Sequence, residues 1–282
     1  MFIRCWGARG SIPVSGPEYK RYGGATTCVE IRTVEGAVLI VDAGTGIRRL
    51  GNLLLEEGRK QCTLLFTHAH WDHLMGFPFF KPIYRRDFSL DVYGCPLESG
   101  SMQHVLGGLM SPPYFPVPLA QICADVTWRQ ICMQGSPQRI GGLEVHAIAL
   151  DHPNQGLGYK FVEQGRSFVF LTDNELRGGH PGGRSFDGYV DFCRGAELLM
   201  HDAEFTDAEY AHTRGWGHST WRAALELALA AQVRQFGLFH HNQDRTDDAL
   251  DDIVVQCRQV VASAGRDMHC FAVRQGGEMD LL

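Results

Sequence analysis

The stretch Thr67-His68-Ala69-His70-Trp71-Asp72-His73 carries most of the information on what this chain is. It directly follows residues 62–66, an apolar run typical of a buried strand. His68 and His70 are two positions apart, so in an extended chain both side chains project to the same side. Asp72 and the last histidine lie on the turn that follows, where they can face a second ion. Imidazole and carboxylate are common metal ligands, so this cluster predicts two adjacent metal ions rather than one.

The rest of the chain reads as one α/β domain spanning residues 1–282. Segments rich in β-branched and apolar residues alternate with helical patterns in both halves, and no linker or low-complexity tract separates them. Helices are predicted over residues 101–110, 189–194, 219–231 and 247–264, and residues 270–277 are predicted to form a hairpin.

Composition narrows the class of protein. Hydrophobic residues make up 44% of the 282 residues, and no apolar run approaches the roughly 20 residues that a membrane-spanning helix needs. The N-terminus lacks a signal pattern, and the 9 cysteines include no C-x-x-C pair, so reduced thiols and a cytoplasmic location are expected. The net charge of −6 argues against non-specific binding to nucleic acid.

Three further ligand candidates each follow an apolar strand: His152, Asp173 and His240. Polar residues at strand ends are typical of sites, because loops at sheet edges carry function. His146 lies inside a predicted strand and is therefore not a candidate. Either His240 or its neighbour His241 could face a metal, but successive strand residues point to opposite sides, so only one of the pair is expected to do so.

Together these residues resemble the motifs of the metallo-β-lactamase superfamily. The segment from His68 to His73 matches the signature motif, and Asp42 matches a buried structural aspartate ahead of it. The resemblance implies a four-layer αββα sandwich. It also implies a first metal held by His68, His70 and His152, a second held by Asp72, His73 and His240, and Asp173 bridging the two. The ions are expected to be divalent, with zinc first and manganese or iron as alternatives, and relatives are often homodimers.

A second pair of motifs indicates a branch of the superfamily. Residues 201–205 and 217–220 resemble motifs of the ribonuclease Z-like phosphodiesterases, a group that also contains small cyclic-phosphate hydrolases. The resemblance implies that His218 contacts the phosphate or donates a proton. Both Asp202 and Glu204 are candidates for its carboxylate partner.

Two absences refine the expected substrate. The stretch between His152 and Asp173 has no room for the RNA-gripping arm of bacterial ribonuclease Z, which argues against transfer RNA and for a small-molecule substrate. Only a helix and the predicted hairpin follow His240, so we expect no substrate domain of the kind that glyoxalase II-like thioesterases carry.

The expected function is therefore a dinuclear metal-dependent hydrolase, a phosphodiesterase for a small or cyclic phosphodiester. The attacking group is expected to be a hydroxide shared by the metals, positioned by Asp72, with His218 protonating the leaving oxygen. Trp71, Trp216 and Trp221 are candidates for the walls around the substrate, with Tyr114 and Phe115 of a proline-rich loop. The alternatives are a thioester or lactam hydrolase of the same fold, or a non-catalytic metal-binding accessory protein.

Overall fold

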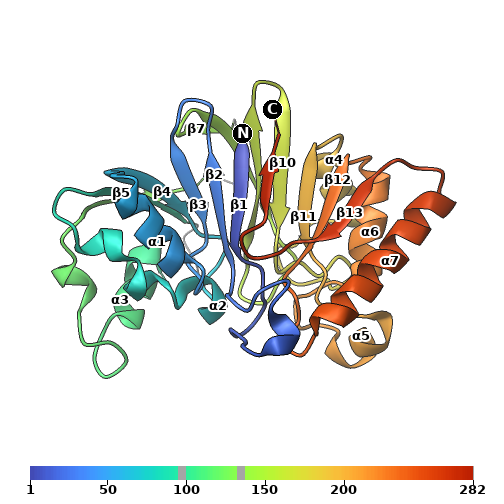
Figure 1. Cartoon of the computed structure of the whole chain (residues 1–282), viewed down its shortest axis with the longest axis horizontal. Coiled ribbons are helices and arrows are strands. Elements are labelled where there is room, and N and C mark those ends of the chain that lie inside the picture. The colour runs from blue at the N-terminus through green and yellow to red at the C-terminus, as the bar shows by residue number, and fades with distance from the viewer. Residues whose placement is uncertain (95–99, 132–136, 282) are drawn as a thin grey trace.

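The computed structural model describes residues 1–94, 100–131 and 137–281. Its two seven-stranded mixed sheets face each other, and helices cover their outer faces (Figure 1). This arrangement confirms the αββα sandwich. The core between the sheets is built from both of them, as shown by the buried side chains of Ile3, Leu39, Leu65, Phe161 and Phe170.

The first sheet runs in the order β14-β1-β2-β3-β4-β5-β6. Its strands are β14 (Glu278–Asp280), β1 (Phe2–Gly7), β2 (Cys28–Arg32), β3 (Val38–Val41), β4 (Gln61–Leu65), β5 (Ser89–Gly94) and β6 (Asp125–Gln130). Its outer face is covered by α1 (Ile47–Glu56), α2 (Trp71–Leu74) and α3 (Met102–Leu109). Helix α1 is amphipathic, and it packs Ile47, Leu50 and Leu54 against the sheet.

The second sheet runs in the order β13-β12-β11-β10-β9-β8-β7. Its strands are β13 (His269–Ala272), β12 (Gln235–Phe239), β11 (Leu198–Asp202), β10 (Arg166–Leu171), β9 (Leu157–Glu163), β8 (Leu143–Ala149) and β7 (Gln138–Ile140). The helices on this side are α4 (Phe186–Cys193), α5 (Asp207–Thr213), α6 (Trp221–Ala230) and α7 (Asp247–Ser263). Helices α4, α6 and α7 share one apolar core with the outer face of this sheet.

The four predicted helices are present, with ends shifted by a few residues. Thr220 is the N-cap of α6 and accepts a hydrogen bond from the backbone amide of Ala223, whereas the neighbouring Ser219 hydroxyl donates to the carbonyl of Asn174. Helix α5 was not predicted, although its capping box, Thr206 with Glu209, is readable in the sequence. Two of the nine cysteines, Cys95 and Cys132, lie outside the described residues.

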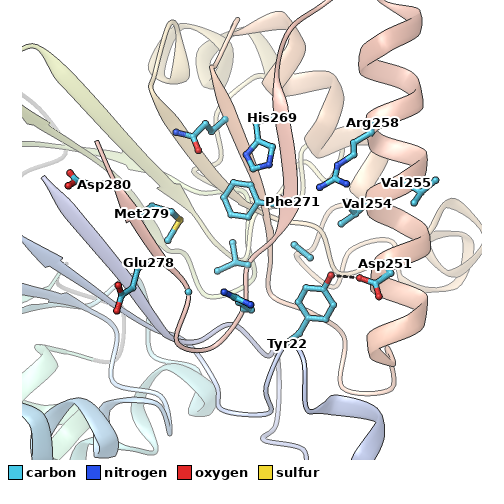
Figure 2. A pocket seen from close by; sticks show the side chains of 15 residues that line it. Tyr22, Asp251, Val254, Val255, Arg258, His269, Phe271, Glu278, Met279 and Asp280 are labelled. Atoms are coloured by element: carbon cyan, nitrogen blue, oxygen red, sulfur yellow. Dashed lines mark hydrogen bonds between the residues drawn. The ribbon is translucent and has the colours of Figure 1, made fainter. Parts of the chain in front are cut away.

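The predicted C-terminal hairpin is wrong. Strand β13 pairs in parallel with β12 in the second sheet, whereas β14 crosses over and pairs antiparallel with β1 in the first. The turn residues at 276–277 therefore connect the two sheets instead of closing a hairpin. A pocket of about 630 Å³ opens between these two edge strands and α7, lined among others by Tyr22, Val254 and Phe271 (Figure 2). None of the predicted metal ligands lines it.

The strand directions bring the ends of several strands to one place. Strands β3 and β4 run parallel, as do β10, β11 and β12, so each of these strands releases its next residues at the same edge of its sheet. No helix among the described residues is both long and apolar enough to cross a membrane.

Candidate metal centre

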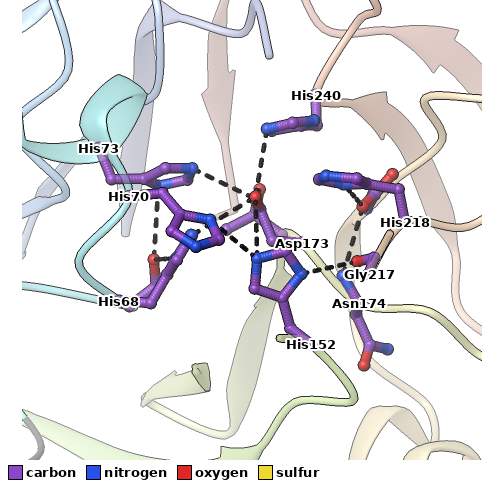
Figure 3. Close-up of polar contacts among 12 residues, drawn as sticks. His68, His70, His73, His152, Asp173, Asn174, Gly217, His218 and His240 are labelled. Atoms are coloured by element: carbon purple, nitrogen blue, oxygen red, sulfur yellow. Dashed lines mark hydrogen bonds and ion pairs between the residues drawn. The ribbon is translucent and has the colours of Figure 1, made fainter. Parts of the chain in front are cut away.

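All seven predicted metal ligands converge at one end of the sandwich, beyond the ends of the strands that precede them. Figure 3 labels six of them, His68, His70, His73, His152, Asp173 and His240. Their ligand atoms form two groups that share Asp173, and within each group the atoms lie within 4.8 Å of one another. The groups are His68, His70, His152 and Asp173, and Asp72, His73, Asp173 and His240. The partition is the one that the resemblance implied, and the residues are arranged for metal binding.

The first group joins the turn after β4 to the loops after β8 and β10. His152 Nε2 lies 3.1 Å from Nδ1 of His70, and Asp173 Oδ2 lies 3.5 Å from Nε2 of His68. The other nitrogen of His152 donates a hydrogen bond of 2.8 Å to the carbonyl of Gly217. This bond fixes the ring so that Nε2 is the nitrogen turned towards the other ligands.

The second group packs two carboxylates against two imidazoles. Asp72 Oδ2 lies 3.3 Å from His73 Nε2 and 3.1 Å from His240 Nε2. Asp173 reaches the same two nitrogens, at 3.2 Å from His73 and 3.3 Å from His240. Asp173 is thus the one carboxylate placed between both groups.

Three site residues have a left-handed backbone. The φ values are 62° for Asp42, 50° for Asp173 and 56° for His240. Asp42 and His240 are the first residues after their strands, and Asp173 is the second. Non-glycine residues rarely adopt this conformation, and such strain persists where the surrounding structure requires it. Here it brings Asp173 and His240 to the other ligands, and Asp42 to His73.

The donor atoms fit a divalent cation. His68 Nε2 and His73 Nε2 are buried and make no hydrogen bond of good geometry, although carboxylate oxygens lie 3.2–3.5 Å away, which is costly unless another ligand satisfies them. Burial lowers the pKa of both imidazoles, and in His73 the carboxylates of Asp72 and Asp173 more than offset this and raise its pKa, whereas that of His68 stays well below its usual value. A bound cation supplies the positive charge that these buried carboxylates need.

Hydrogen bonds behind the ligands hold them in place. Asp42 is fully buried, accepts a 2.8 Å bond from His73 Nδ1, and also accepts from the backbone amide and hydroxyl of Thr67. Its structural role agrees with the resemblance. On the opposite sheet, Glu204 accepts a 2.9 Å bond from Nδ1 of His240.

The choice between the two adjacent histidines is resolved by their directions. His240 lies in the cluster, whereas His241 turns away and donates a 2.7 Å hydrogen bond to the carbonyl of Val273. The structure thus brings His240 to the other ligands and keeps its neighbour in the core. His146, which the sequence set aside, is half-buried and pairs with Glu144.

His218 lies beside the second group, with its ring stacked on His240 at a centroid distance of 4.7 Å. Its Nδ1 donates to Asp202 Oδ2 at 2.7 Å, while Glu204 is 3.4 Å away and bonded to His240. Asp202 is therefore the direct partner and Glu204 serves the neighbouring imidazole. Burial lowers the pKa of His218, but Asp202 and Glu204 more than offset it and raise the pKa to about 9.

Three contacts at the site were not found from the sequence. The backbone amide of Ser11 donates to Asp72 Oδ2 at 2.9 Å, which brings the N-terminal glycine-rich loop to the metal centre. The side-chain amide of Asn174 lies 3.1 Å from His201 Nε2. Buried Glu175 accepts hydrogen bonds from the loop that carries His218. Only the first had a signal in the sequence, the unusual glycine content of residues 7–16.

The predicted aromatic walls are only partly present. Trp71, Trp216 and Tyr114 are exposed, at 74%, 62% and 79%. Phe115 is half-buried against Phe79, with ring centroids 5.7 Å apart. Trp221 is 3% exposed in the core beneath α6, so its assignment to the wall is wrong. It occupies a helix position that faces the second sheet.

Comparison with known proteins places the chain in a family. The model of the beta-lactamase superfamily domain matches residues 38–241, more than half of the chain, so the chain belongs to this superfamily. A ribonuclease Z from Haloferax volcanii is 25% identical over 291 residues, covering 88% of this chain and 87% of the relative. The chain is a metal-dependent hydrolase with the metallo-β-lactamase fold.

Two solved structures share the fold along their whole length. A diphosphatase from the PhnP family matches with a TM-score of 0.70 and 16% identity, covering 100% of this chain and 98% of its own. The short form of human tRNase Z matches with a TM-score of 0.66 and 18% identity, covering all of both chains.

The prediction against transfer RNA as a substrate is wrong. Relatives named ribonuclease Z align along most of this chain, and a tRNase Z has the same fold. Strands β9 and β10 do fill the stretch between His152 and Asp173. However, the lack of one inserted segment removes one surface for gripping RNA and leaves the cluster of metal-ligand residues in place. The net charge of −6 is likewise a sum over the chain and says nothing about the charge near the site.

Proposed function

We propose that the chain is a phosphodiesterase that works with two divalent ions, zinc in the first instance, held by the two ligand groups. The observation that carries the proposal is His218, an imidazole bonded through Nδ1 to Asp202 and placed beside the metal ligands. Hydrolysis of a thioester by the same metals gives such a proton donor no clear place, because a thiolate leaves without being protonated. When bound, the ions supply a water of lowered pKa and positive charge for the phosphoryl oxygens.

Four residues of the protein have separate roles in the proposed reaction. Asp173 lies between both groups, and Asp72, held by the amide of Ser11 and by His240, positions the attacking water. His218 delivers the proton from Nε2 to the departing oxygen, since its Nδ1 is bonded to Asp202. Asp202 thereby fixes the tautomer and the ring orientation.

A panel of substrates tests the proposal. The metal-loaded protein is given a p-nitrophenyl diester, cyclic nucleotides, a transfer-RNA precursor, a chromogenic lactam and a glutathione thioester. We expect turnover of phosphodiesters above the other two. The precursor and the cyclic nucleotides separate the two kinds of phosphodiester substrate, because the similar proteins include a ribonuclease Z and a diphosphatase.

The variant His218→Ala sharpens the same test. With an unactivated alkoxide leaving group, it should slow turnover by roughly 10²–10⁴-fold at unchanged metal content. The loss should be smaller with the aryl leaving group, which needs little protonation. A preference for lactam or thioester, together with a silent His218→Ala, would contradict the proposal.

A further inference from the structure

Glu175 is a fully buried carboxylate that the proposed mechanism does not use. It lies two residues beyond Asp173, and its side chain is 0% exposed. Burying a carboxylate is costly unless its oxygens are well hydrogen-bonded, and no lysine or arginine pairs with it among the described residues. Its partners are therefore the key to what it does.

Four donors surround the Glu175 carboxylate. Oε1 accepts from the backbone amide of Gly215 at 2.8 Å and from the Tyr210 hydroxyl at 2.7 Å. Oε2 accepts from the amide of Gly217 at 2.8 Å and lies 3.1 Å from His180 Nε2. Three of the four donors belong to one segment, residues 210–217, which runs from the middle of α5 to the residue before His218.

This segment contacts the metal centre at its last residue. The carbonyl of Gly217 accepts the hydrogen bond from His152 Nδ1 (Figure 3). A Cβ at position 217 would lie 2.0 Å from that nitrogen, so the backbone approaches as closely as a glycine permits. Gly217 and Gly215 also have φ values of 91° and 85°, which other residues rarely adopt. The turn is thus held in an unusual shape, and Glu175 binds an amide on each side of Trp216.

Asn174, which precedes Glu175, makes backbone hydrogen bonds to two residues next to His218 in space or in sequence. The backbone amide of Asn174 lies 3.3 Å from Asp202 Oδ2, and its carbonyl accepts from the Ser219 hydroxyl at 2.5 Å. The chain is therefore held on both sides of His218. Glu175 binds the turn before His218, and the backbone of Asn174 binds Ser219 after it and Asp202, its carboxylate partner.

We infer that Glu175 is a positioning residue that sets the place of His218 through the turn at residues 215–217. It does not touch the reacting atoms. The inference rests on the proposed function, because the role of His218 as a proton donor is part of it. Without the carboxylate, two backbone amides and a hydroxyl lose their common acceptor, and the imidazole moves away from the leaving oxygen.

The test compares turnover of two substrates that differ in their leaving group. The metal is kept at saturating concentration, so that a loss of metal affinity caused by movement of His152 does not affect the rates. Glu175→Gln keeps the shape of the side chain, but its NH₂ group replaces one oxygen that accepts hydrogen bonds from the turn or its neighbours. We expect the ratio of kcat for an alkoxide-leaving diester to kcat for the p-nitrophenyl diester to fall by about 10–100-fold. In a His218→Ala background the same substitution should leave this ratio unchanged, because the two residues act as a unit.

Glu30→Gln is the matched control. Glu30 is also a buried, hydrogen-bonded glutamate, but it lies on β2 and binds Trp6 and Arg32. Its substitution should lower thermal stability and leave the leaving-group ratio as in the wild type. If Glu175→Gln does not fold, Tyr210→Phe removes a single donor from the same carboxylate and should shift the ratio in the same direction by less.

An unchanged ratio in a folded Glu175→Gln or Tyr210→Phe protein, or an equal loss with both substrates, overturns the inference and leaves the proposed function standing. If the wild type cleaves no phosphodiester at all, the proposed function falls, and the inference with it.

Discussion

The two sheets supply the metal centre in opposite ways. The first sheet contributes four ligands from one short turn, the segment from His68 to His73 after β4. The second sheet contributes His152, Asp173 and His240 one at a time, after β8, β10 and β12. The first half of the site is thus defined by local sequence, whereas the second exists only when several strands are correctly paired.

The residues that hydrogen-bond to the site residues also differ between the two sheets. In the first sheet, Asp42 alone holds both Thr67 and His73. In the second, the candidate ligands and the proposed proton donor have separate partners, such as Glu204 for His240 and Asp202 for His218. We therefore expect damage in the second half to be separable residue by residue, except at Asp173, where the two halves meet.

Asp173→Ala should have the largest effect, because it removes the one carboxylate that belongs to both groups. Elemental analysis should show greater metal loss than in His240→Ala, which removes a ligand of one group. The loss of activity should exceed the roughly 10–100-fold that changes behind the ligands cause. Retention of two metals in Asp173→Ala would show that this residue does not bridge the halves.

His240→Ala and His241→Gln form the next pair. The first should deplete mainly one ion, because only His240 faces the cluster. The second should keep the full metal content, since glutamine can still donate to the carbonyl of Val273. Metal-to-protein ratios of the two purified variants check this, and the reverse result would assign the ligand to position 241.

Gly217→Ala should damage the second half through the backbone. The added Cβ meets His152 Nδ1 at 2.0 Å, and the left-handed conformation costs about 1–2 kcal/mol in addition. Gly215→Ala is the control, because its φ is similar and nothing lies within 4 Å of its Cβ. Thermal unfolding should show both variants destabilised, while titration with metal should show weakened binding in Gly217→Ala alone.

Trp216→Ala should have the smallest effect. The indole is 62% exposed on the turn next to His152, so its removal costs little stability. If it stacks on a base, KM for a nucleotide diester should rise by about tenfold, the lower end of measured stacking energies. KM for a diester with only alkyl groups should stay the same. If Trp216→Ala leaves KM for the nucleotide diester unchanged, or raises KM for both diesters equally, Trp216 has only a structural role in the turn.

Much of this could be read from the sequence. The cluster from His68 to His73 requires only that a strand end in a turn, and the apolar residues at 62–66 already indicate that strand. His152, Asp173 and His240 could be proposed because each also follows an apolar run. The partition into two groups came from the resemblance, and the distances agree with it.

Other features depended on the tertiary structure. The hairpin prediction failed because β13 and β14 look adjacent in sequence yet pair with strands of different sheets. Local turn residues cannot specify which partner a strand finds, since that choice depends on the free edges of the assembled sheets. The buried place of Trp221 has the same origin, because the apolar core that it joins is formed by α6 together with strands of the second sheet and with α4 and α7.

The sequence by itself determined the ligand types and the strands that present them, and its motifs carried the resemblance that implied the class of fold. Only the tertiary structure decided that Asp202 serves His218 and Glu204 serves His240, and that Glu175 binds the turn before His218. The physical reason is that ligand chemistry is a property of single residues and their immediate neighbours. Hydrogen-bond partnership instead requires two groups to meet within about 3 Å, and for residues far apart in the chain only the packed sheets bring them to that distance.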